Sequence, residues 1–213
     1  MNTITLKKED LERLRASGYV DNEDMAKIEY KSGAVSSQSL FKTIPIEDYI
    51  FFMFHLLKVE KINLETLALK CAKMGCKIFA ITSKNKIIER LTETAEAFLR
   101  GSVSREELNL QIKKVSDWRK QMKRTALPSE LAAASCAYSA ACAVETKEFY
   151  GYFFAVRDTF IAINNNPYHY MMAPPSQRLK VAKAASYEML VGHATINENL
   201  RAEFRTLVEE FIK

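Results

Sequence analysis

The sequence predicts an all-α protein, a compact bundle of about eight or nine helices with an N-terminal helical arm. Apolar residues recur at helical spacing along nearly the whole chain, and we find no strand-like run of alternating apolar and polar residues, so we expect no sheet. The 213 residues include only 6 Gly and 5 Pro, which argues against a turn-rich β-sandwich. Their 48% apolar content can fill a core and excludes a wholly disordered chain.

We expect two parts, an N-terminal helical arm over residues 1–40 and a single α-helical domain over residues 41–213. The arm holds two predicted helices, one over about 6–16 with Thr5 as N-cap and one from Asp21 to Gly33. A polar stretch from Ser36 to Ser39 follows them. It is the one linker that the composition indicates, so we place the boundary there.

The domain contains the remaining predicted helices. They run from Pro45 to Leu57, Asn63 to Phe79, 86 to 100, 105 to 124, 130 to 145, 149 to 163, and from Thr195 toward the C-terminus. The sequence specifies the N-termini of two of these helices clearly, because Ser104 with Glu107 and Thr195 with Glu198 each match a capping box. Gly101 is expected to end the helix over 86–100.

Two neighbouring segments form the predicted centre of the domain. Residues 130–145 include seven alanines, and residues 149–163 carry six aromatic side chains in their first twelve positions. At 100° per residue, one face of the second segment holds only small side chains, those of Gly151, Ala155, Thr159 and Ala162. We predict that this face packs closely against the alanine-rich helix, because small side chains let helices approach each other.

The sequence contains no motif typical of catalysis, metal binding or cofactor binding, so we expect a protein that is not an enzyme and needs no metal or cofactor. The four cysteines lie in apolar helical windows at spacings foreign to zinc and redox motifs, and are predicted to be structural thiols. The three histidines, His55, His169 and His193, are isolated in the sequence. A spatial cluster of His169, Asp158 and a cysteine stays open as an alternative.

The positive charge is concentrated in the middle of the chain. Residues 58–124 carry 16 basic and 8 acidic side chains, whereas the net charge of the whole chain is +5. On the predicted helix over 105–124, Lys113, Lys120 and Arg124 share one arc, a basic edge. Such an edge is typical of a solvated helix face, and it can also steer an acidic protein or follow the phosphates of a nucleic acid.

Arg157 is the second candidate position. It lies among the aromatic residues of its helix, where a guanidinium needs an ion pair, a ring to stack on, or a ligand. The structural interpretation is a buried ion pair with Glu130 or Glu145, and the functional one is contact with a ligand or partner. Asp158 is adjacent in sequence, so we do not expect it to face Arg157.

The third candidate is the connection over residues 164–175. Its side chains Tyr168, His169, Tyr170 and Met171 are larger and more apolar than a solvated loop needs. They fit either a loop packed over the core or a partner-binding loop.

We expect a cytoplasmic protein without membrane association. The longest aromatic and aliphatic run, Tyr49 to Leu57, is interrupted by His55 and is much shorter than a membrane span. The first fifteen residues carry charges where a signal peptide needs an apolar core.

The order of segments carries a family resemblance. The helix LETLALKCAKMGCKIFA is followed by KIIERLTETAEAFLRGSVSREELN, by a basic helix through DWRKQ, and by the alanine-rich AAASCAYSAACAVET. Over residues 64–156 this order resembles immunity proteins of the Imm-five type, small helical proteins proposed to neutralise polymorphic bacterial toxins. The resemblance implies a helical scaffold, a bacterial or phage setting and a partner-inhibiting role.

The chain also departs from that pattern. Asn85 and Lys86 stand where relatives tend to have Arg-Pro, and Ser102 stands where they have Glu. In the family, the alanine-rich part contains histidines at intervals, whereas this chain has no histidine between His55 and His169. A site built on those histidines is therefore not carried over.

The leading functional hypothesis is a non-enzymatic protein, immunity-like or an inhibitor, that occludes a toxin or another effector. Its expected contacts are Tyr168, His169, Tyr170 and Met171, with Lys113, Lys120 and Arg124 steering an acidic partner. One alternative is a nucleic-acid-associated protein that uses residues 58–124. Another is a small-molecule binder or enzyme with a pocket beside Arg157. The sequence leaves self-association open.

Overall fold

The computed structural model describes residues 4–16, 22–56, 64–164 and 193–212. These residues hold ten helices and one two-stranded sheet, which confirms the predicted all-α class. They divide into two compact units, unit 1 (Met1–Asn63 with Arg205–Lys213) and unit 2 (Leu64–Phe204). The predicted boundary near residue 40 lies inside a helix of unit 1, Ser37–Thr43. None of the described helices is both long and apolar enough to cross a membrane.

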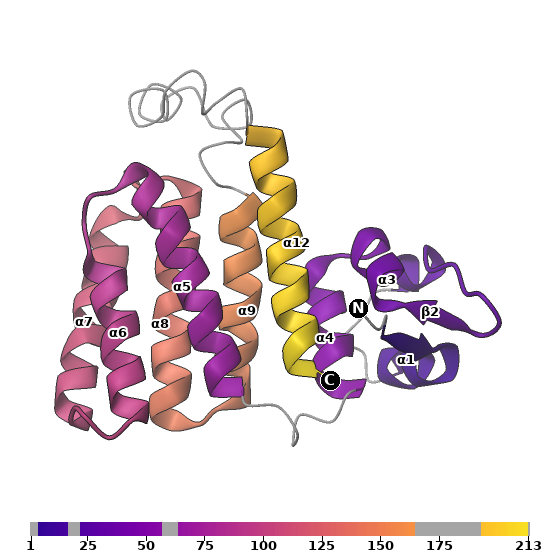
Figure 1. The fold of residues 1–213 in the computed structure, drawn as a ribbon, viewed down its shortest axis with the longest axis horizontal. Coiled ribbons are helices and arrows are strands. Elements are labelled where there is room, and N and C mark those ends of the chain that lie inside the picture. Colours follow the sequence, from indigo (N-terminus) through magenta and orange to yellow (C-terminus); the bar gives the residue numbers. More distant parts are fainter. Residues whose placement is uncertain (1–3, 17–21, 57–63, 165–192, 213) are drawn as a thin grey trace. The chain divides into compact units, whose positions relative to one another are not determined.

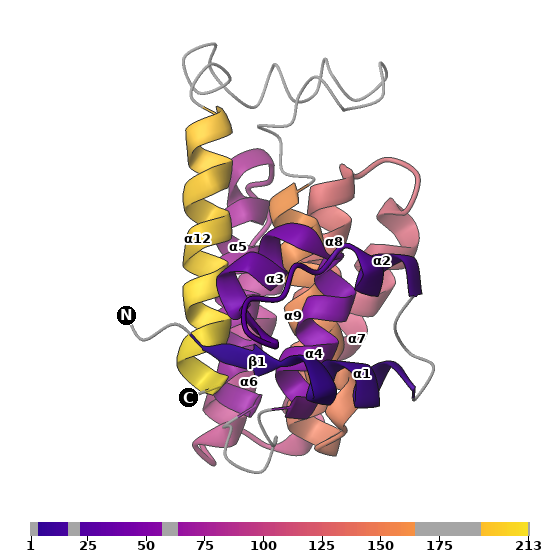
Figure 2. The same cartoon turned by 90° about the vertical axis from the view of Figure 1, so that its right-hand side faces the viewer.

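Unit 1 is built from short elements (Figure 2). In chain order they are β1 (Thr5–Lys7), α1 (Lys8–Arg15), α2 (Asn22–Ala26), β2 (Ala34–Ser36), α3 (Ser37–Thr43), α4 (Ile46–Leu56) and the last residues of α12 (His193–Ile212). The fully buried side chains of α4 supply most of its large core residues: Tyr49, Ile50, Phe52 and Met53. The predicted start of this helix at Pro45 is confirmed, because α4 begins at the next residue.

The expectation of no sheet is wrong. β1 and β2 form an antiparallel ribbon in which Leu6 lies opposite Val35, and both side chains are buried. The turn before β2 contains Ser32 and Gly33 with φ of 53° and 75°. Strands of three residues are too short to show the alternation that identifies a strand in sequence.

The ribbon also changes the predicted helices of the arm. Thr5 lies in β1 instead of capping a helix, and α1 starts only at Lys8. α2 ends at Ala26, seven residues before the predicted end, because the chain must turn to pair β2 with β1. The predicted linker is a helix start, since the Ser36 hydroxyl accepts a hydrogen bond from the Ser39 amide at 3.1 Å and caps α3.

Glu209, in the last part of α12, completes unit 1. Its carboxylate accepts hydrogen bonds from the Ser37 hydroxyl at 2.9 Å and from the Tyr49 hydroxyl at 3.5 Å. Arg205, one turn earlier on the same helix, lies 3.8 Å from the same carboxylate oxygen. Unit 1 is therefore made from two pieces of chain that are distant in sequence.

Unit 2 is a bundle whose helices α5 to α9 stand side by side (Figure 1). They are α5 (Leu64–Thr82), α6 (Ile87–Leu99), α7 (Arg105–Met122), α8 (Pro128–Thr146) and α9 (Phe149–Asn164), joined by the first part of α12. α8 packs against α5, α6, α7 and α9, so the alanine-rich helix is the centre of the unit.

The predicted close packing of α8 and α9 is confirmed. A Cβ added to Gly151 would lie 2.7 Å from the Cβ of Ala143, and Ala140 and Ala155 have no exposed surface. The Cys136 thiol lies 2.8 Å from the Thr159 hydroxyl across the same interface. The small-residue face of α9 therefore allows backbone-to-backbone approach that larger side chains would prevent.

One buried carboxylate fixes the start of α8. Glu130 accepts a hydrogen bond from the Leu127 amide at 2.8 Å, which is the backbone half of a capping box. It also accepts one from the Thr82 hydroxyl of α5 at 2.8 Å. The end of α5 and the start of α8 are thus held together by a charged group that is only 3% exposed.

The two predicted capping boxes have different outcomes. The Ser104 hydroxyl accepts a hydrogen bond from the Glu107 amide at 3.2 Å, so Ser104 caps α7 as expected. α12 begins at His193, so Thr195 lies inside the helix and its prediction as N-cap is wrong. Gly101, with φ of 71°, follows the end of α6 as predicted.

Candidate functional site

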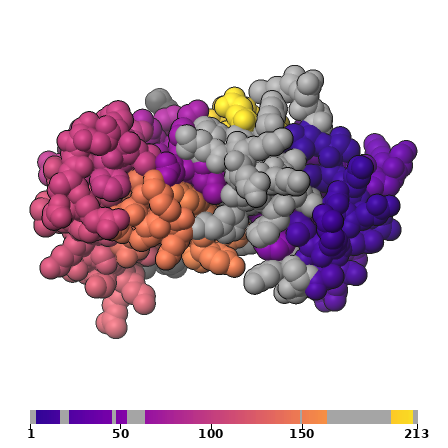
Figure 3. Space-filling model, turned by 90° about the horizontal axis from the view of Figure 1, so that it is seen from below, coloured from indigo at the N-terminus to yellow at the C-terminus, as the bar shows by residue number. Residues whose placement is uncertain are grey.

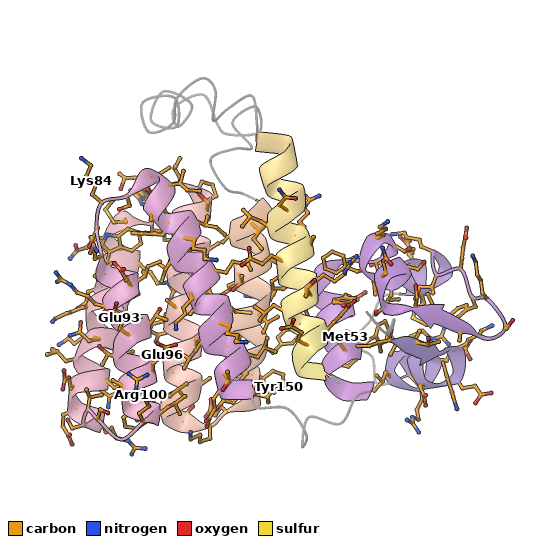
Figure 4. All side chains as sticks on the ribbon, viewed as in Figure 1. Met53, Lys84, Glu93, Glu96, Arg100 and Tyr150 are labelled. Atoms are coloured by element: carbon orange, nitrogen blue, oxygen red, sulfur yellow. The ribbon has the colours of Figure 1, made fainter. Side chains whose placement is uncertain are left out.

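Aromatic side chains and an arginine form an exposed surface on α9, which we call the α9 patch: Tyr150, Phe153, Phe154 and Arg157. The side chains of Tyr150 and Phe154 are 60% and 38% exposed, among the few large apolar residues of the described chain with such exposure. Tyr150 lies near the start of α9 (Figure 4), and α9, coloured orange, forms part of the molecular surface in Figure 3. Large apolar residues gathered on one surface are typical of interaction sites.

The side chains of the patch hold one another in place. The rings of Phe153 and Phe154 meet edge to face at 5.8 Å, and those of Tyr150 and Phe154 lie 6.4 Å apart. The Arg157 guanidinium carbon lies 4.7 Å from the centre of the Phe154 ring, a cation–π contact. These contacts hold the four side chains in fixed positions relative to one another.

Arg157 forms an ion pair, but with Asp158 and not with Glu130 or Glu145 as predicted. Its Nε and one terminal nitrogen donate to the same Asp158 oxygen at 3.1 and 2.8 Å. We excluded Asp158 because adjacent residues diverge by 100° on a helix. The long arginine side chain bends across that angle while it stacks on Phe154, so the divergence of the Cβ atoms does not decide the pairing.

The other two carboxylates already have partners. Glu145 pairs with Arg105 at 3.2 Å, and Glu130 holds α8 to α5. The Arg157 side chain stays 31% exposed, against 9% for Asp158, so the guanidinium lies at the surface instead of in the core. It has five N–H donors, and its bonds to Asp158 use only part of them.

The position of the patch follows from the helical wheel. Gly151, Ala155 and Thr159 face α8, and the residues at 150, 154 and 157 lie together on a different arc of the helix, where their side chains reach solvent. Arg157 was predicted from the sequence as a candidate residue, whereas the exposure of Tyr150 and Phe154 beside it was not predicted. The sequence did contain a signal, because all three residues lie within one arc of the helix outside the small-residue face.

The basic edge on α7 is exposed as a solvated face would be. Lys113, Lys120 and Arg124 all reach solvent, and Lys120 lies 3.9 Å from Asp117. Within the described part of the chain, neither Lys113 nor Arg124 forms an ion pair. Lys113 and Arg124 therefore contribute positive charge without an ion-pair partner among the described residues, and the functional role of the basic edge stays a prediction.

The remaining candidates fall outside the structural description. Tyr168, His169, Tyr170 and Met171 lie outside the described residues, and with them the histidine on which the alternative cluster of His169, Asp158 and a cysteine depends. In the ranges that the structure covers, no group of three or more His, Cys, Asp or Glu side chains is placed to hold a metal ion.

All four cysteines are reduced and lie on helices, as predicted for structural thiols. Burial raises the pKa of Cys71 to about 12 and that of Cys76 to about 11, and it raises the pKa of Cys136 as well. A thiol with such a pKa is protonated at neutral pH and is a poor nucleophile.

The raised thiol pKa values predict that the protein loses stability in alkali. Above about pH 9, the ordinary value for these thiols, the unfolded chain releases protons that the folded chain keeps, so the free energy of unfolding should fall as the pH rises toward 11. Denaturant titrations between pH 8 and 11 measure this slope. The Cys76→Ala variant should show a shallower slope, and a flat or rising profile in the wild type would contradict the prediction.

Comparison with known proteins does not add a family. The chain matches no protein-family model, no curated protein and no solved structure. The likeness of residues 64–156 to Imm-five immunity proteins therefore stays a hypothesis that rests on the sequence.

Proposed function

We propose that this protein acts by binding another protein, as an immunity-like protein or inhibitor that occludes a toxin or other effector. The observation that carries the proposal is the α9 patch. Tyrosine, phenylalanine and arginine are enriched at protein interfaces, and tyrosine and arginine are frequent among the residues that dominate binding energy.

The composition of the patch suits recognition of a protein surface. Tyr150 and Phe154 offer large rigid areas with few rotatable bonds, so little conformational entropy is lost on binding. Arg157 is already held by Phe154 and Asp158, and its remaining N–H groups can donate to carbonyl or carboxylate oxygens of a partner.

The packing beneath the patch supports a rigid binding surface. α9 rests on α8 through alanine, glycine and threonine, residues with few side-chain rotamers, and α8 contacts the other bundle helices. The exposed basic edge of α7 adds a positive field that would speed the approach of an acidic partner.

The test is recovery of a partner from cells in which the protein is naturally made. Tagged wild type and the double variant Tyr150→Ala/Phe154→Ala are used as baits, and bound proteins are quantified by mass spectrometry. We expect one or a few proteins to be recovered with the wild type, and their recovery to fall about tenfold or more with the double variant, since loss of two interface aromatics is costly.

A matched control is available on α7. Leu110 is 52% exposed and lies away from the patch, so Leu110→Ala should recover the same proteins as the wild type. The proposal is wrong if the double variant, with unchanged helical circular dichroism, recovers every protein as well as the control does.

A further inference from the structure

A groove of about 460 Å³ lies between α6 and α7, and we call it the α6–α7 groove. Its size falls within the range of about 300–1,000 Å³ that is usual for sites of small ligands. The groove belongs wholly to unit 2, and none of its lining residues belongs to the α9 patch. Its chemistry therefore has to be explained separately from the proposed protein binding.

Two cations face this groove without a carboxylate partner. Arg90 of α6 and Lys114 of α7 line it, both are exposed, and among the residues that the structure describes neither forms an ion pair. The one acidic residue of the lining, Asp117, lies 3.9 Å from Lys120, which is not part of the lining. The lining thus holds two cations and one carboxylate, and its net charge is positive.

Two lysines near α6, outside the groove lining, are paired with carboxylates of that helix. Lys73 of α5 lies 2.6 Å from Glu96, and Lys86 lies 3.3 Å from Glu89. Figure 4 shows Glu93, Glu96 and Arg100 following one another along α6. The helix thus has carboxylates within reach of lysines, but none of them lies in the α6–α7 groove.

The start of α6 adds to the positive field. Asn85 lines the groove, and its side-chain oxygen accepts a hydrogen bond from the Ile87 amide at 3.0 Å, at the first residue of the helix. The N-terminal end of a helix carries a partial positive charge and favours anions. Since Asn85 already accepts from the first amide of α6, the groups of the lining that favour a ligand with an anionic group such as phosphate are the side chains of Arg90 and Lys114.

An aromatic ring and amide groups complete the lining. Trp118 is partly exposed, and its ring meets the ring of buried Phe79 edge to face at 5.4 Å, which fixes the orientation of the indole. Gln111 and Gln121 line the same groove from α7. A fixed indole is a stacking surface for a nucleic-acid base, and amides can pair with the donors and acceptors at a base edge.

We propose that the α6–α7 groove binds a nucleotide, with the base against Trp118 and the phosphate at Arg90 and Lys114. The same chemistry is offered by a free nucleotide and by one nucleotide of a single strand. Binding of either would be a function additional to the protein contact at the α9 patch.

The protein has a built-in reporter for this site, because Trp118 is its single tryptophan. Tryptophan fluorescence of the full chain is titrated with ATP, with AMP, with a single-stranded oligothymidylate and with inorganic phosphate. We expect saturable quenching by at least one nucleotide or by the oligonucleotide. Quenching by free nucleotides indicates a metabolite site, and quenching by the oligonucleotide alone indicates a single-strand site.

Charge variants separate this groove from general electrostatic attraction. Arg90→Ala and Lys114→Ala should each weaken binding by about five- to tenfold, since each removes one phosphate contact. The matched control is Arg100→Ala, which removes the same charge from the far end of α6, is exposed, and does not line the groove (Figure 4). It should change affinity by less than about twofold.

Two results would overturn the inference. One is the absence of saturable quenching with every nucleotide and with the oligonucleotide, and the other is equal weakening by Arg100→Ala and Lys114→Ala at unchanged helical circular dichroism. The double variant Tyr150→Ala/Phe154→Ala should bind the same ligand as the wild type does. Failure at this groove and failure of the proposed protein binding are therefore distinguishable.

Discussion

Replacing Phe79 by alanine should lower the free energy of unfolding by about 3–5 kcal/mol, the usual cost of removing a buried aromatic side chain. Phe79 is 2% exposed, and its ring packs edge to face on Trp118, so it connects α5 to α7. Its removal leaves a cavity between these helices, which the rigid bundle around α8 can close only in part.

Denaturant unfolding followed by Trp118 fluorescence and by helical circular dichroism measures this loss. Trp118 belongs to unit 2, so its fluorescence reports that unit, while circular dichroism reports both units. Leu110→Ala, on the exposed side of α7, should stay within about 0.5 kcal/mol of the wild type. A loss below 1 kcal/mol for Phe79→Ala would show that Phe79 does not hold α5 and α7 together.

The second large effect is expected for Gly151→Ala, which should change stability in the direction opposite to that usual for glycine-to-alanine substitutions in helices. Replacing glycine by alanine inside a helix normally stabilises it by up to about 1 kcal/mol. At Gly151 the added methyl carbon would lie 2.7 Å from the Cβ of Ala143, an atom that cannot move without the backbone of α8. Gly151→Ala should therefore destabilise the protein by about 1–3 kcal/mol, as overpacked cores do. Ala155→Leu, on the same face, should act in the same direction.

Gly75 supplies the matched control for this variant. It lies on α5 and also faces α8, but a Cβ there would lie 3.5 Å from its nearest neighbour, the Ala133 carbonyl oxygen, which is an ordinary contact. Gly75→Ala should be neutral or stabilising in the same denaturant titration. Equal effects of the two substitutions would refute the view that α8 and α9 approach more closely than α8 and α5.

The bundle of unit 2 could be predicted from sequence because its signals are local. Helical spacing identified α5 to α9, Ser104 marked the start of α7, and Gly101 marked the end of α6. The pairing of α8 with α9 followed from one face of small side chains, a pattern that only a close neighbour explains. These features depend on residues within a few helical turns of one another.

The features that were missed depend on contacts across the chain or on side-chain flexibility. Leu6 pairs with Val35, which is distant in sequence, so nothing near Leu6 along the chain reveals a strand. Arg157 was assigned the wrong carboxylate because its guanidinium turns along the helix toward Asp158.

Of the candidate surfaces, the exposed basic edge was predictable from a single helical wheel. The groove beside Trp118 was not, because it needs Arg90 of α6 and Lys114 of α7 brought together by antiparallel packing. Residues on two helices share no periodicity, so sequence spacing cannot show that they meet. The α9 patch was predictable only in part. The helical wheel places its residues on one arc, but which arc reaches solvent depends on how α9 packs against α8.

The contacts of Glu209 have a consequence for synthesis on the ribosome. Ser37 and Tyr49 leave the ribosome long before Glu209 is made, so their shared acceptor is absent while the bundle from Leu64 to Phe204 emerges. Domains generally fold in the order in which they are synthesised. Here the N-terminal unit must wait for the C-terminal helix, and the middle of the chain is the first part able to fold completely.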